Sequence, residues 1–304
     1  MSGVSIRAVD LGKRYLLGRR KHDMDLRESL AETLCWGFRW PVARNAIPRA
    51  RLIDPPSGSH WVLRRVHFEI ESNDIVGILG ENGKGKTTLL KILARISHPT
   101  EGYAEVRGRV GALLDGGAGF HGELTGRENA FLLASLLGAE RVKNQRQLDA
   151  MMAFAELDES LDTPLKYYSS GMCVRLAFAV AAHLDVEVLL IDEVLAAADA
   201  NFQKKSLEKM TSLNGQRTIL VVSHDLEYVQ QLCRHVIVLS QGRVAFFGSA
   251  SEGVDYYRSI STCRHEELRD RRGAEGSKLS APTDASTSDR PAAEATACSG
   301  TIQS

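Results

Sequence analysis

The sequence predicts an α/β fold in which helices cover both faces of a largely parallel β-sheet. Short apolar runs occur at Ile75–Leu79, Val188–Ile191 and Thr218–Val222, and segments of helical texture separate them. Uniformly apolar strands of this kind are buried on both faces, and their alternation with helices is typical of parallel sheets. The 304 residues are 43% hydrophobic and 25% charged, which is enough apolar material for a sizeable core.

The first elements of this pattern follow one another closely along the chain. Residues Val62–Ile70 alternate between apolar and polar, as in a strand with one buried face. The buried-type strand Ile75–Leu79 comes next, and Thr88–Ile96 has the apolar spacing of a helix. The two later apolar strands follow a helical stretch at Cys173–Leu184, and no internal repeat is evident.

Composition excludes several classes of protein. Thirty-eight Lys and Arg balance thirty-eight Asp and Glu, so neither a generally basic nucleic-acid surface nor an acidic tail is indicated. No apolar run reaches the roughly 18 residues of a membrane-spanning helix. The amino terminus carries Arg7 and Asp10 and lacks the apolar core of a secretory signal, so we expect a cytoplasmic protein. The five cysteines form no CxxC pair, which favours neither a zinc site nor a disulfide framework.

A basic insertion is predicted at residues 16–60. The first sixty residues hold eleven Lys or Arg and six Asp or Glu, a surplus of five positive charges. Within them an apolar residue recurs every fourth position, as on one face of a helix, at Leu26, Leu30, Leu34 and Phe38. This helix either packs on its own domain or meets a membrane partner or lipid headgroups, where Trp and Arg are favoured.

The carboxy-terminal residues 262–304 are predicted to form a disordered tail. They are rich in Ser, Thr, Ala and charged residues, and Leu279 and Ile302 are the large aliphatic residues after Leu268. Such a segment buries too little apolar surface to offset its chain entropy. The alternative is a short interaction helix near Glu266–Arg272.

A phosphate-binding loop is predicted at residues 80–87. The segment Gly-Glu-Asn-Gly-Lys-Gly-Lys-Thr fits the pattern GxxxxGK[ST] and lies between a strand and a helix, as the motif requires. Its glycines let successive backbone N–H groups point at phosphate oxygens, and the helix presents its positive end to the anion. Lys86 is expected to reach the β- and γ-phosphates of a nucleotide, and the Thr87 hydroxyl to bind Mg²⁺. The predicted phosphate-binding residues are Gly80, Asn82, Gly83, Gly85, Lys86, Thr87 and Thr88.

Two carboxylates are predicted to complete this site. Asp192 and Glu193 directly follow the apolar run Val188–Ile191, and Asp192 lies 106 residues after Lys86. A buried strand delivers the residues at its end to the carboxyl edge of the sheet. We expect Asp192 to contribute to the Mg²⁺ shell and Glu193 to act as the general base that polarises the attacking water.

The segment Tyr168–Met172 resembles the signature sequence of ABC-type ATPases. It reads Tyr-Ser-Ser-Gly-Met and begins a helix some twenty residues before the strand that ends in Asp-Glu. The family's usual sequence is Leu-Ser-Gly-Gly-Gln, but with Arg175–Ala179 this version is similar to the subgroup that exports lipid-linked polysaccharides such as O-antigen, capsule and teichoic acid. Ser169 and Gly171 at a helix N-terminus still form an anion site.

The resemblance implies roles for further residues. His224, after the strand Thr218–Val222, corresponds to a histidine that contacts the γ-phosphate. Asp199 corresponds to the acid of the D-loop. The family commonly has a glutamine in its Q-loop. In the corresponding segment of this sequence the nearest oxygen-bearing side chain is Asp115, which is assigned as a metal ligand. Tyr15 is the expected adenine-stacking residue, with Trp61 as the alternative.

The same resemblance implies the organisation and the activity of the chain. Residues 1–261 form an ABC-type nucleotide-binding domain of the P-loop NTPase class, with an antiparallel β subdomain and a helical subdomain at residues 120–184. Two copies form a head-to-tail homodimer that binds ATP and Mg²⁺ at the cytoplasmic face of the inner membrane. A separate membrane-spanning permease then carries the lipid-linked polysaccharide, and nucleic acid is not a partner. The alternatives are transport of another lipid or solute, or a soluble ABC ATPase that acts without a transporter.

Overall fold

The computed structural model describes residues 3–16, 59–114, 119–137 and 145–262. Most of the predicted insertion at 16–60, all but the first residue of the predicted tail at 262–304, and Asp115 lie outside the described residues. The chain divides into two units, residues 1–259 and 260–304. The elements and the site described below belong to the first unit.

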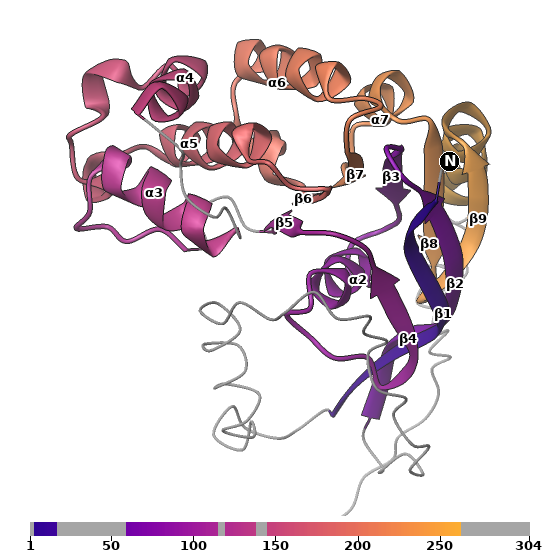
Figure 1. Ribbon diagram of the computed structural model, residues 1–304. Coiled ribbons are helices and arrows are strands. Elements are labelled where there is room, and N and C mark those ends of the chain that lie inside the picture. Colours follow the sequence, from indigo (N-terminus) through magenta and orange to yellow (C-terminus); the bar gives the residue numbers. More distant parts are fainter. Residues whose placement is uncertain (1–2, 17–58, 115–118, 138–144, 263–304) are drawn as a thin grey trace, which may run out of the picture. The chain divides into compact units, whose positions relative to one another are not determined.

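The described strands form two β-sheets (Figure 1). The smaller sheet is antiparallel and has the order β2-β1-β4. The larger has the order β5-β6-β7-β3-β8-β9, parallel from β5 to β8, with β9 antiparallel to β8. The strands are β1 Val4–Leu16, β2 Ser59–Glu71, β3 Ile75–Leu79, β4 Glu101–Val106, β5 Val110–Leu113, β6 Val188–Asp192, β7 Thr218–Val222, β8 His235–Ser240 and β9 Arg243–Ser249.

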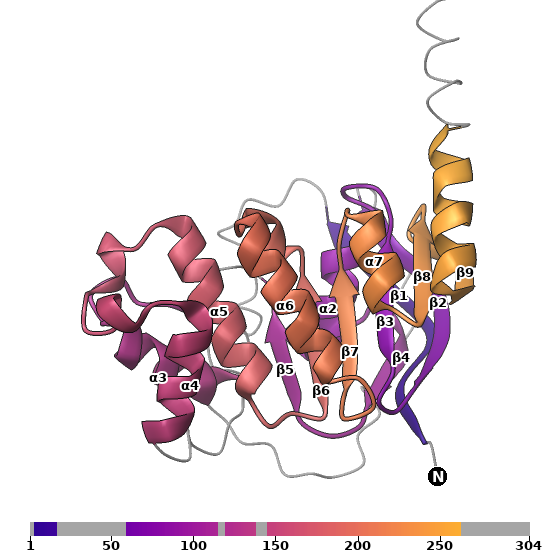
Figure 2. The same cartoon turned by 90° about the horizontal axis from the view of Figure 1, so that it is seen from above.

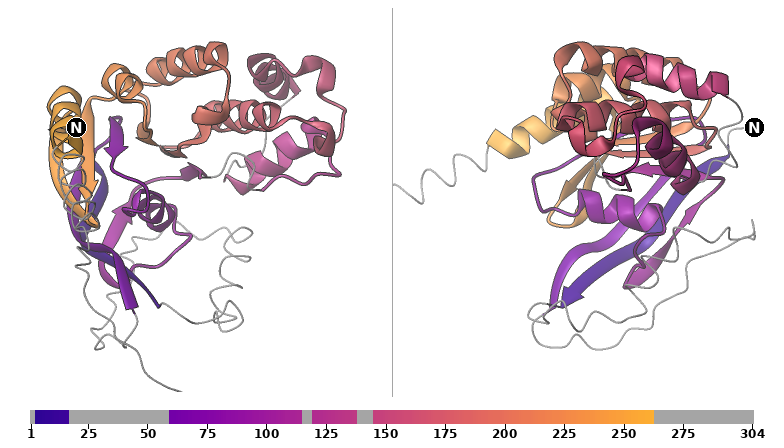
Figure 3. Two further views of the ribbon diagram at one scale, coloured as in Figure 1. Left: turned by 180° about the vertical axis from the view of Figure 1, so that it is seen from behind. Right: turned by 90° about the vertical axis from the view of Figure 1, so that its left-hand side faces the viewer.

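Helices cover the larger sheet on both faces. In Figure 1, α6 and α7 lie on one face of it, and α2 lies on the other, beside the antiparallel sheet. Helices α3, α4 and α5 gather beyond β5 in the same view, in the view from above (Figure 2) and from behind (Figure 3). The helices are α2 Lys86–Leu93, α3 Gly126–Leu136, α4 Gln145–Ala155, α5 Ser170–His183, α6 Ala200–Ser212 and α7 Leu226–Leu232, with 3₁₀ turns η2 Asp158–Ser160, η3 Leu165–Tyr167 and η4 Val194–Ala197. Residues 250–259 are also helical.

The main core lies where α2 is enclosed between the two sheets. Leu89, Leu90 and Leu93 of α2 are buried together with Ile6 of β1 and Ile78 of β3. The strands β3, β6 and β7 are buried at every position, as expected for parallel strands covered on both faces. The predicted α/β fold is therefore confirmed, and no described helix has both the length and the apolar character needed to cross a membrane.

The predicted helix Thr88–Ile96 begins and ends earlier than its apolar pattern indicated. It starts at Lys86, because the last glycine of the predicted loop, Gly85, is its left-handed N-cap. It ends at Leu93, because Arg95 adopts a left-handed backbone with φ of 62°. The phosphate-loop lysine and threonine thus form the first turn of the helix itself.

Aromatic rings join the helices that gather beyond β5 to α6. The ring centroid of Phe178 on α5 lies 6.1 Å from that of Phe154 on α4 and 6.0 Å from that of Phe202 on α6. Phe178 is fully buried, and its edge-to-face packing on Phe202 adds to the hydrophobic gain of burial. This contact fixes α5, the helix that begins with the predicted signature, against its neighbours.

We expect Phe178→Ala to lower the free energy of unfolding by about 3–5 kcal/mol, because it opens a cavity among these rings. Urea denaturation followed by circular dichroism measures the change. Phe131→Ala is the matched control, since Phe131 on α3 is 38% exposed and its loss should change stability little. Equal stability losses in the two variants would contradict this account of the core.

Candidate active site

The candidate site lies at the carboxyl ends of β3, β6 and β7. These strands are parallel neighbours in the order β6-β7-β3, and Val222 pairs with Ile78 on one side and Asp192 on the other. Their carboxyl ends therefore meet at one edge of the sheet. The loop 80–87 follows β3, Glu193 follows β6, and His224 lies just after β7. Segments more than 100 residues apart in sequence are thus neighbours.

The loop between β3 and α2 has the conformation of an anion cradle. Gly83 and Gly85 have φ of 75° and 98°, a region that favours glycine. No side chain caps the start of α2. The first backbone N–H groups of a helix have no intrahelical acceptor, so those of Lys86, Thr87 and Thr88 suit phosphate oxygens.

The ammonium group of Lys86 is buried beneath this loop. Its Nζ atom donates hydrogen bonds to the carbonyl oxygens of Gly80 at 2.8 Å and Glu81 at 3.2 Å. It also lies 3.5 Å from Oε1 of Glu193, and the residue is only 5% exposed. Burying a charge is costly unless it is paired and hydrogen-bonded, and this ammonium is both.

Glu193 links the ends of β6 and β7. Its backbone N–H donates to the carbonyl of Val222 at 3.0 Å, and its Oε1 atom lies 2.9 Å from Nε2 of His224. Its backbone is left-handed, with φ of 51°, which costs a non-glycine residue on the order of 1 kcal/mol. The Glu193 carboxylate is thus held between the Lys86 ammonium and the His224 imidazole, and the side chains of Glu193 and His224 remain partly exposed.

Asp192 and Thr87 are the oxygen donors suited to a hard cation. Asp192 ends β6, its side chain is largely buried, and Thr87 is exposed in the first turn of α2. Carboxylate and hydroxyl oxygens suit Mg²⁺, which is usually held by few protein groups together with substrate phosphates. The described residues contain no group of three His, Cys, Asp or Glu that could hold a metal alone. The donor set therefore fits a cation shared with phosphate.

The predicted signature and D-loop residues cap helices within the chain. Ser169 Oγ accepts a hydrogen bond from the N–H of Met172 at 3.2 Å, which makes it the N-cap of α5. Asp199 Oδ1 accepts from the N–H of Phe202 at 2.9 Å at the start of α6. This backbone hydrogen bond lowers the pKa of Asp199. Gly171 is likewise part of the first turn of α5 and lies beside the carbonyl of Ala197 in η4.

The candidate adenine-stacking residues lie on paired strands. Tyr15 of β1 pairs with His60 of β2 and is 42% exposed, and the Lys13 ammonium lies 5.2 Å from its ring centroid. Trp61 of β2 has the guanidinium groups of Arg14 and Arg64 at 5.2 and 5.5 Å from its ring.

The residue after Trp61, Val62, contacts the phosphate loop. A Cβ atom on Gly85 would lie 3.0 Å from the carbonyl oxygen of Val62, so the backbone after Trp61 packs on that loop.

Asp115 is outside the described residues, and its predicted role as a metal ligand stays a prediction.

Gln203 is a residue that the sequence analysis missed. Its side-chain amide donates to the carbonyls of Leu195 at 3.0 Å and Ala198 at 3.1 Å. These bonds hold the turn that connects Glu193 to Asp199. A glutamine one turn after a helix N-cap is common on exposed helices, so no sequence signal distinguishes it.

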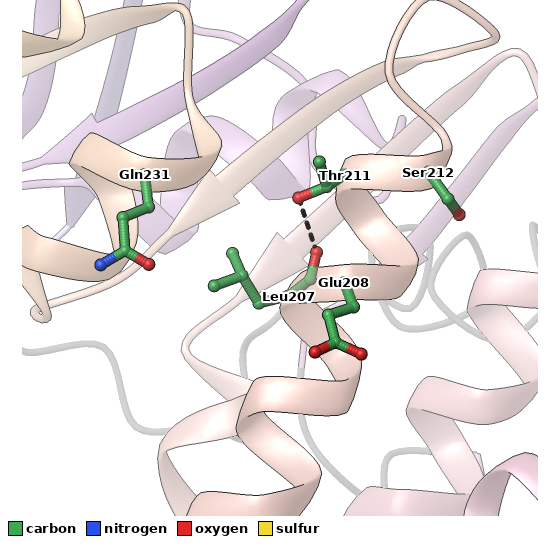
Figure 4. A pocket seen from close by; sticks show the side chains of 5 residues that line it. All are labelled: Leu207, Glu208, Thr211, Ser212 and Gln231. Carbon is green, nitrogen blue, oxygen red and sulfur yellow. Dashed lines mark hydrogen bonds between the residues drawn. The ribbon is translucent and has the colours of Figure 1, made fainter.

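A groove elsewhere on the described surface lies between α6 and α7. Figure 4 shows the residues that line it, with the Thr211 hydroxyl donating to the carbonyl of Leu207 at 2.8 Å. The lining residues are Leu207, Glu208, Thr211, Ser212 and Gln231. None of them belongs to the loop 80–87 or to the strand ends described above, so the groove is separate from the candidate site.

Comparison with known proteins gives the family. The ABC transporter family profile matches residues 63–196. The O-antigen export system ATP-binding protein RfbB of Klebsiella pneumoniae is 38% identical over 200 residues, which cover 66% of this chain and 81% of that protein. The chain belongs to the ABC transporter family. The predicted recognition and the predicted enzyme class, an ABC-type ATPase, are thereby confirmed.

Other ABC relatives agree with the predicted subgroup. RfbB of Myxococcus xanthus is 45% identical over 197 residues, which cover 64% of this chain and 45% of that protein. The teichoic acids export ATP-binding protein TagH of Bacillus anthracis is 37% identical over 199 residues, covering 65% of this chain and 36% of that protein. The chain thus spans less than half the length of these two relatives.

The fold of solved ABC proteins is the same. A dimeric post-hydrolysis ATP-binding cassette bound to ADP and Pi superposes with a TM-score of 0.62 at 18% identity, over 81% of this chain and 98% of that one. This likeness confirms the predicted ABC-type fold, with its helical and antiparallel β parts.

Two glycines of the ABC phosphate loop should differ in their tolerance of alanine. Both have positive φ, but a Cβ atom on Gly85 would lie 2.6 Å from Cδ2 of Leu63, whereas one on Gly83 would meet nothing within 4 Å. We expect Gly85→Ala to cost at least about 1 kcal/mol more stability than Gly83→Ala, which carries only the left-handed strain of about 1–2 kcal/mol. Urea denaturation of both variants measures this, and a larger loss in Gly83→Ala would contradict the described loop packing.

Proposed function

We propose that this chain is the ATP-hydrolysing subunit of an ABC transporter that exports a lipid-linked polysaccharide across the inner membrane. The observation that carries the catalytic part is the placement of the Glu193 carboxylate, 3.5 Å from Lys86 Nζ and 2.9 Å from His224 Nε2. A cation, a carboxylate and an imidazole at one sheet edge beside a phosphate cradle supply what hydrolysis of a phosphoanhydride requires.

ATP binds with its phosphates on the loop 80–87. The N–H groups at Gly80, Asn82, Gly83 and Gly85 and at the start of α2 receive the phosphate oxygens. Lys86 then exchanges its bonds to loop carbonyls for the β- and γ-phosphates. Thr87 and Asp192 would hold Mg²⁺, which when bound neutralises charge on the phosphate oxygens.

Hydrolysis uses Glu193 as the general base. A water molecule attacks the γ-phosphorus, the bond between that phosphorus and the β–γ bridging oxygen breaks, and the carboxylate of Glu193 accepts the water's proton. The products are ADP and inorganic phosphate. His224, in contact with the same carboxylate, orients it and reaches the γ-phosphate.

Two copies are needed for the complete site. Ser169 and Gly171 at the start of α5, and Asp199 at the start of α6, are proposed to contact the nucleotide bound by the other copy of a head-to-tail homodimer. Closure on ATP and opening after hydrolysis supply the motion that drives transport. Adenine stacks on Tyr15 or on Trp61, and Trp61 directly precedes Val62, whose carbonyl oxygen lies beside Gly85 of the phosphate loop.

The cargo and the partner follow from the relatives' names. Proteins named for O-antigen export and for teichoic acids export share 45% and 37% of aligned residues with this chain. Both cargos are long glycans on a lipid carrier, and the name of an export system implies further subunits. We propose a separate membrane-spanning permease, with this subunit at its cytoplasmic face and without nucleic acid as a partner.

Glu193→Gln should abolish turnover while ATP still binds. Removal of a general base costs on the order of 10²- to 10⁴-fold in rate, and glutamine preserves the shape of the side chain. Phosphate release by the purified protein and the affinity for a fluorescent ATP analogue measure the two properties. Glu227→Gln, on the exposed first turn of α7, is the matched control and should leave both unchanged. Full turnover in Glu193→Gln would remove Glu193 from the mechanism.

The same Glu193→Gln change in the native host tests the cargo. We expect one glycan class to disappear from the cell surface while its lipid-linked form accumulates inside, as shown by immunoblotting of surface and intracellular fractions. Unchanged surface glycan, together with lost ATP hydrolysis in the purified protein, would keep the ATPase and favour another lipid or solute as cargo. A subunit found free of membranes in fractionated cells would favour the soluble alternative.

A further inference from the structure

Residues 121–129, the turn before α3 and its first residues, are held together by hydrogen bonds and support the segment that leads to Ser169. We call residues 121–129 the platform. Asn129 is completely buried, accepts a hydrogen bond from the N–H of His121 at 2.7 Å and donates to the carbonyl of Leu124 at 2.9 Å. Thr125 and Glu128 form a capping box, in which the Thr125 N–H donates to Glu128 Oε2 at 2.8 Å. These bonds satisfy the free N–H groups at the start of α3 and fix the preceding turn.

The segment that leads into the signature pairs with this platform by backbone hydrogen bonds. The N–H of Leu165 donates to Leu124 at 2.9 Å, and that of Lys166 to Gly122 at 2.9 Å. In the other direction, the N–H of Arg127 donates to Leu161 at 2.9 Å. The position of residues 161–166 is therefore set by α3 as well as by their own turns.

Tyr168, the residue before Ser169, contacts both the turn at Ser160 and the start of α3. Its hydroxyl donates to the carbonyl of Ser160 at 2.7 Å, and burial raises the pKa of this phenol, so it stays protonated as the bond requires. The phenol lies on Gly126, the first residue of α3. A Cβ atom at Gly126 would collide with the Tyr168 hydroxyl and lie 3.1 Å from its Cζ.

We propose that Tyr168, seated on Gly126, is a positioning residue that places Ser169 for the nucleotide bound by the partner copy. The proposal rests on the proposed function, because Ser169 contacts ATP only in a head-to-tail dimer. Tyr168 has an extended backbone with ψ of 146°, so a displaced ring passes its movement to the next residue, the N-cap of α5. The glycine is required here for space, since its backbone is helical and alanine favours a helix.

A double-mutant cycle tests this pairing through ATP-dependent dimerisation. All variants are made in the full chain with Glu193→Gln, which stops turnover, and dimer formation is followed by light scattering as ATP is titrated. Gly126→Ala pushes against the Tyr168 hydroxyl and should raise the ATP concentration for half-dimerisation at least about tenfold, since a misplacement of about 1 Å can cost on the order of a hundredfold. Tyr168→Phe removes one hydrogen bond and should raise it at most about fivefold.

The combined variant Gly126→Ala, Tyr168→Phe gives the decisive comparison. Without the hydroxyl the clash is largely relieved, so this variant should dimerise at a lower ATP concentration than Gly126→Ala alone. If Tyr168 did not pack against Gly126, the two changes would be additive. The affinity of each variant for a fluorescent ATP analogue under conditions where it is monomeric should equal that of the parent, because the loop 80–87 is untouched.

Tyr168→Ala covers the case in which Gly126→Ala fails to fold, as judged by thermal melting. It leaves room instead of a clash and should still raise the ATP requirement at least about tenfold. Dimerisation like that of the parent in folded Gly126→Ala or Tyr168→Ala, or additive effects in the cycle, would overturn the positioning role alone. A parent protein that stays monomeric at saturating ATP would instead overturn the head-to-tail dimer, and this inference with it.

Discussion

The burial of one ammonium group determines much of the structure around the site. Lys86 is 5% exposed, and its charge is stabilised by the carbonyls of Gly80 and Glu81 and by the Glu193 carboxylate. This pairing is possible only if the ends of β3 and β6 meet at the same edge of the sheet. The order β6-β7-β3 achieves this, with the end of β7 supplying His224 between them. The parallel sheet and the charged cluster therefore depend on each other.

The cluster includes residues with positive φ. Gly83 and Gly85 have positive φ in the loop, and Glu193 is left-handed at the end of β6. The cost at Glu193 is offset by its N–H bond to Val222 and by the contacts of its carboxylate with the Lys86 ammonium and the His224 imidazole. Strain of this kind persists only where the surroundings fix the residue, and it is typical of sites that must present a side chain in one orientation.

Much of the site could be predicted from the sequence because its signals are local. The strand Ile75–Leu79 and the glycine pattern after it specify the loop 80–87, and the apolar run ending in Asp192 and Glu193 specifies the second strand. The end of α2 could not be predicted, because an arginine at position 95 gives no sign of a left-handed backbone.

The long-range contacts could not be predicted either. The pairing of Leu165 and Lys166 with the turn before α3 uses backbone groups, which every residue carries. The packing of Tyr168 against Gly126 brings together two residues that are 42 positions apart in the sequence. In the sequence, Gln203 is indistinguishable from any glutamine on an exposed helix, although its side chain bonds to Leu195. The cap formed by Asp199 likewise becomes evident only when the start of α6 is known.

The most direct test of the central claim is a crystal structure of the Glu193→Gln protein with ATP and Mg²⁺. The account predicts a two-fold symmetric dimer with two ATP molecules, each with its phosphates on residues 80–87 of one copy and against Ser169 and Gly171 of the other. It also predicts Thr87 and Asp192 at the magnesium ion. ATP bound away from the loop 80–87, or a dimer in which the signature of one copy faces no nucleotide, would contradict it.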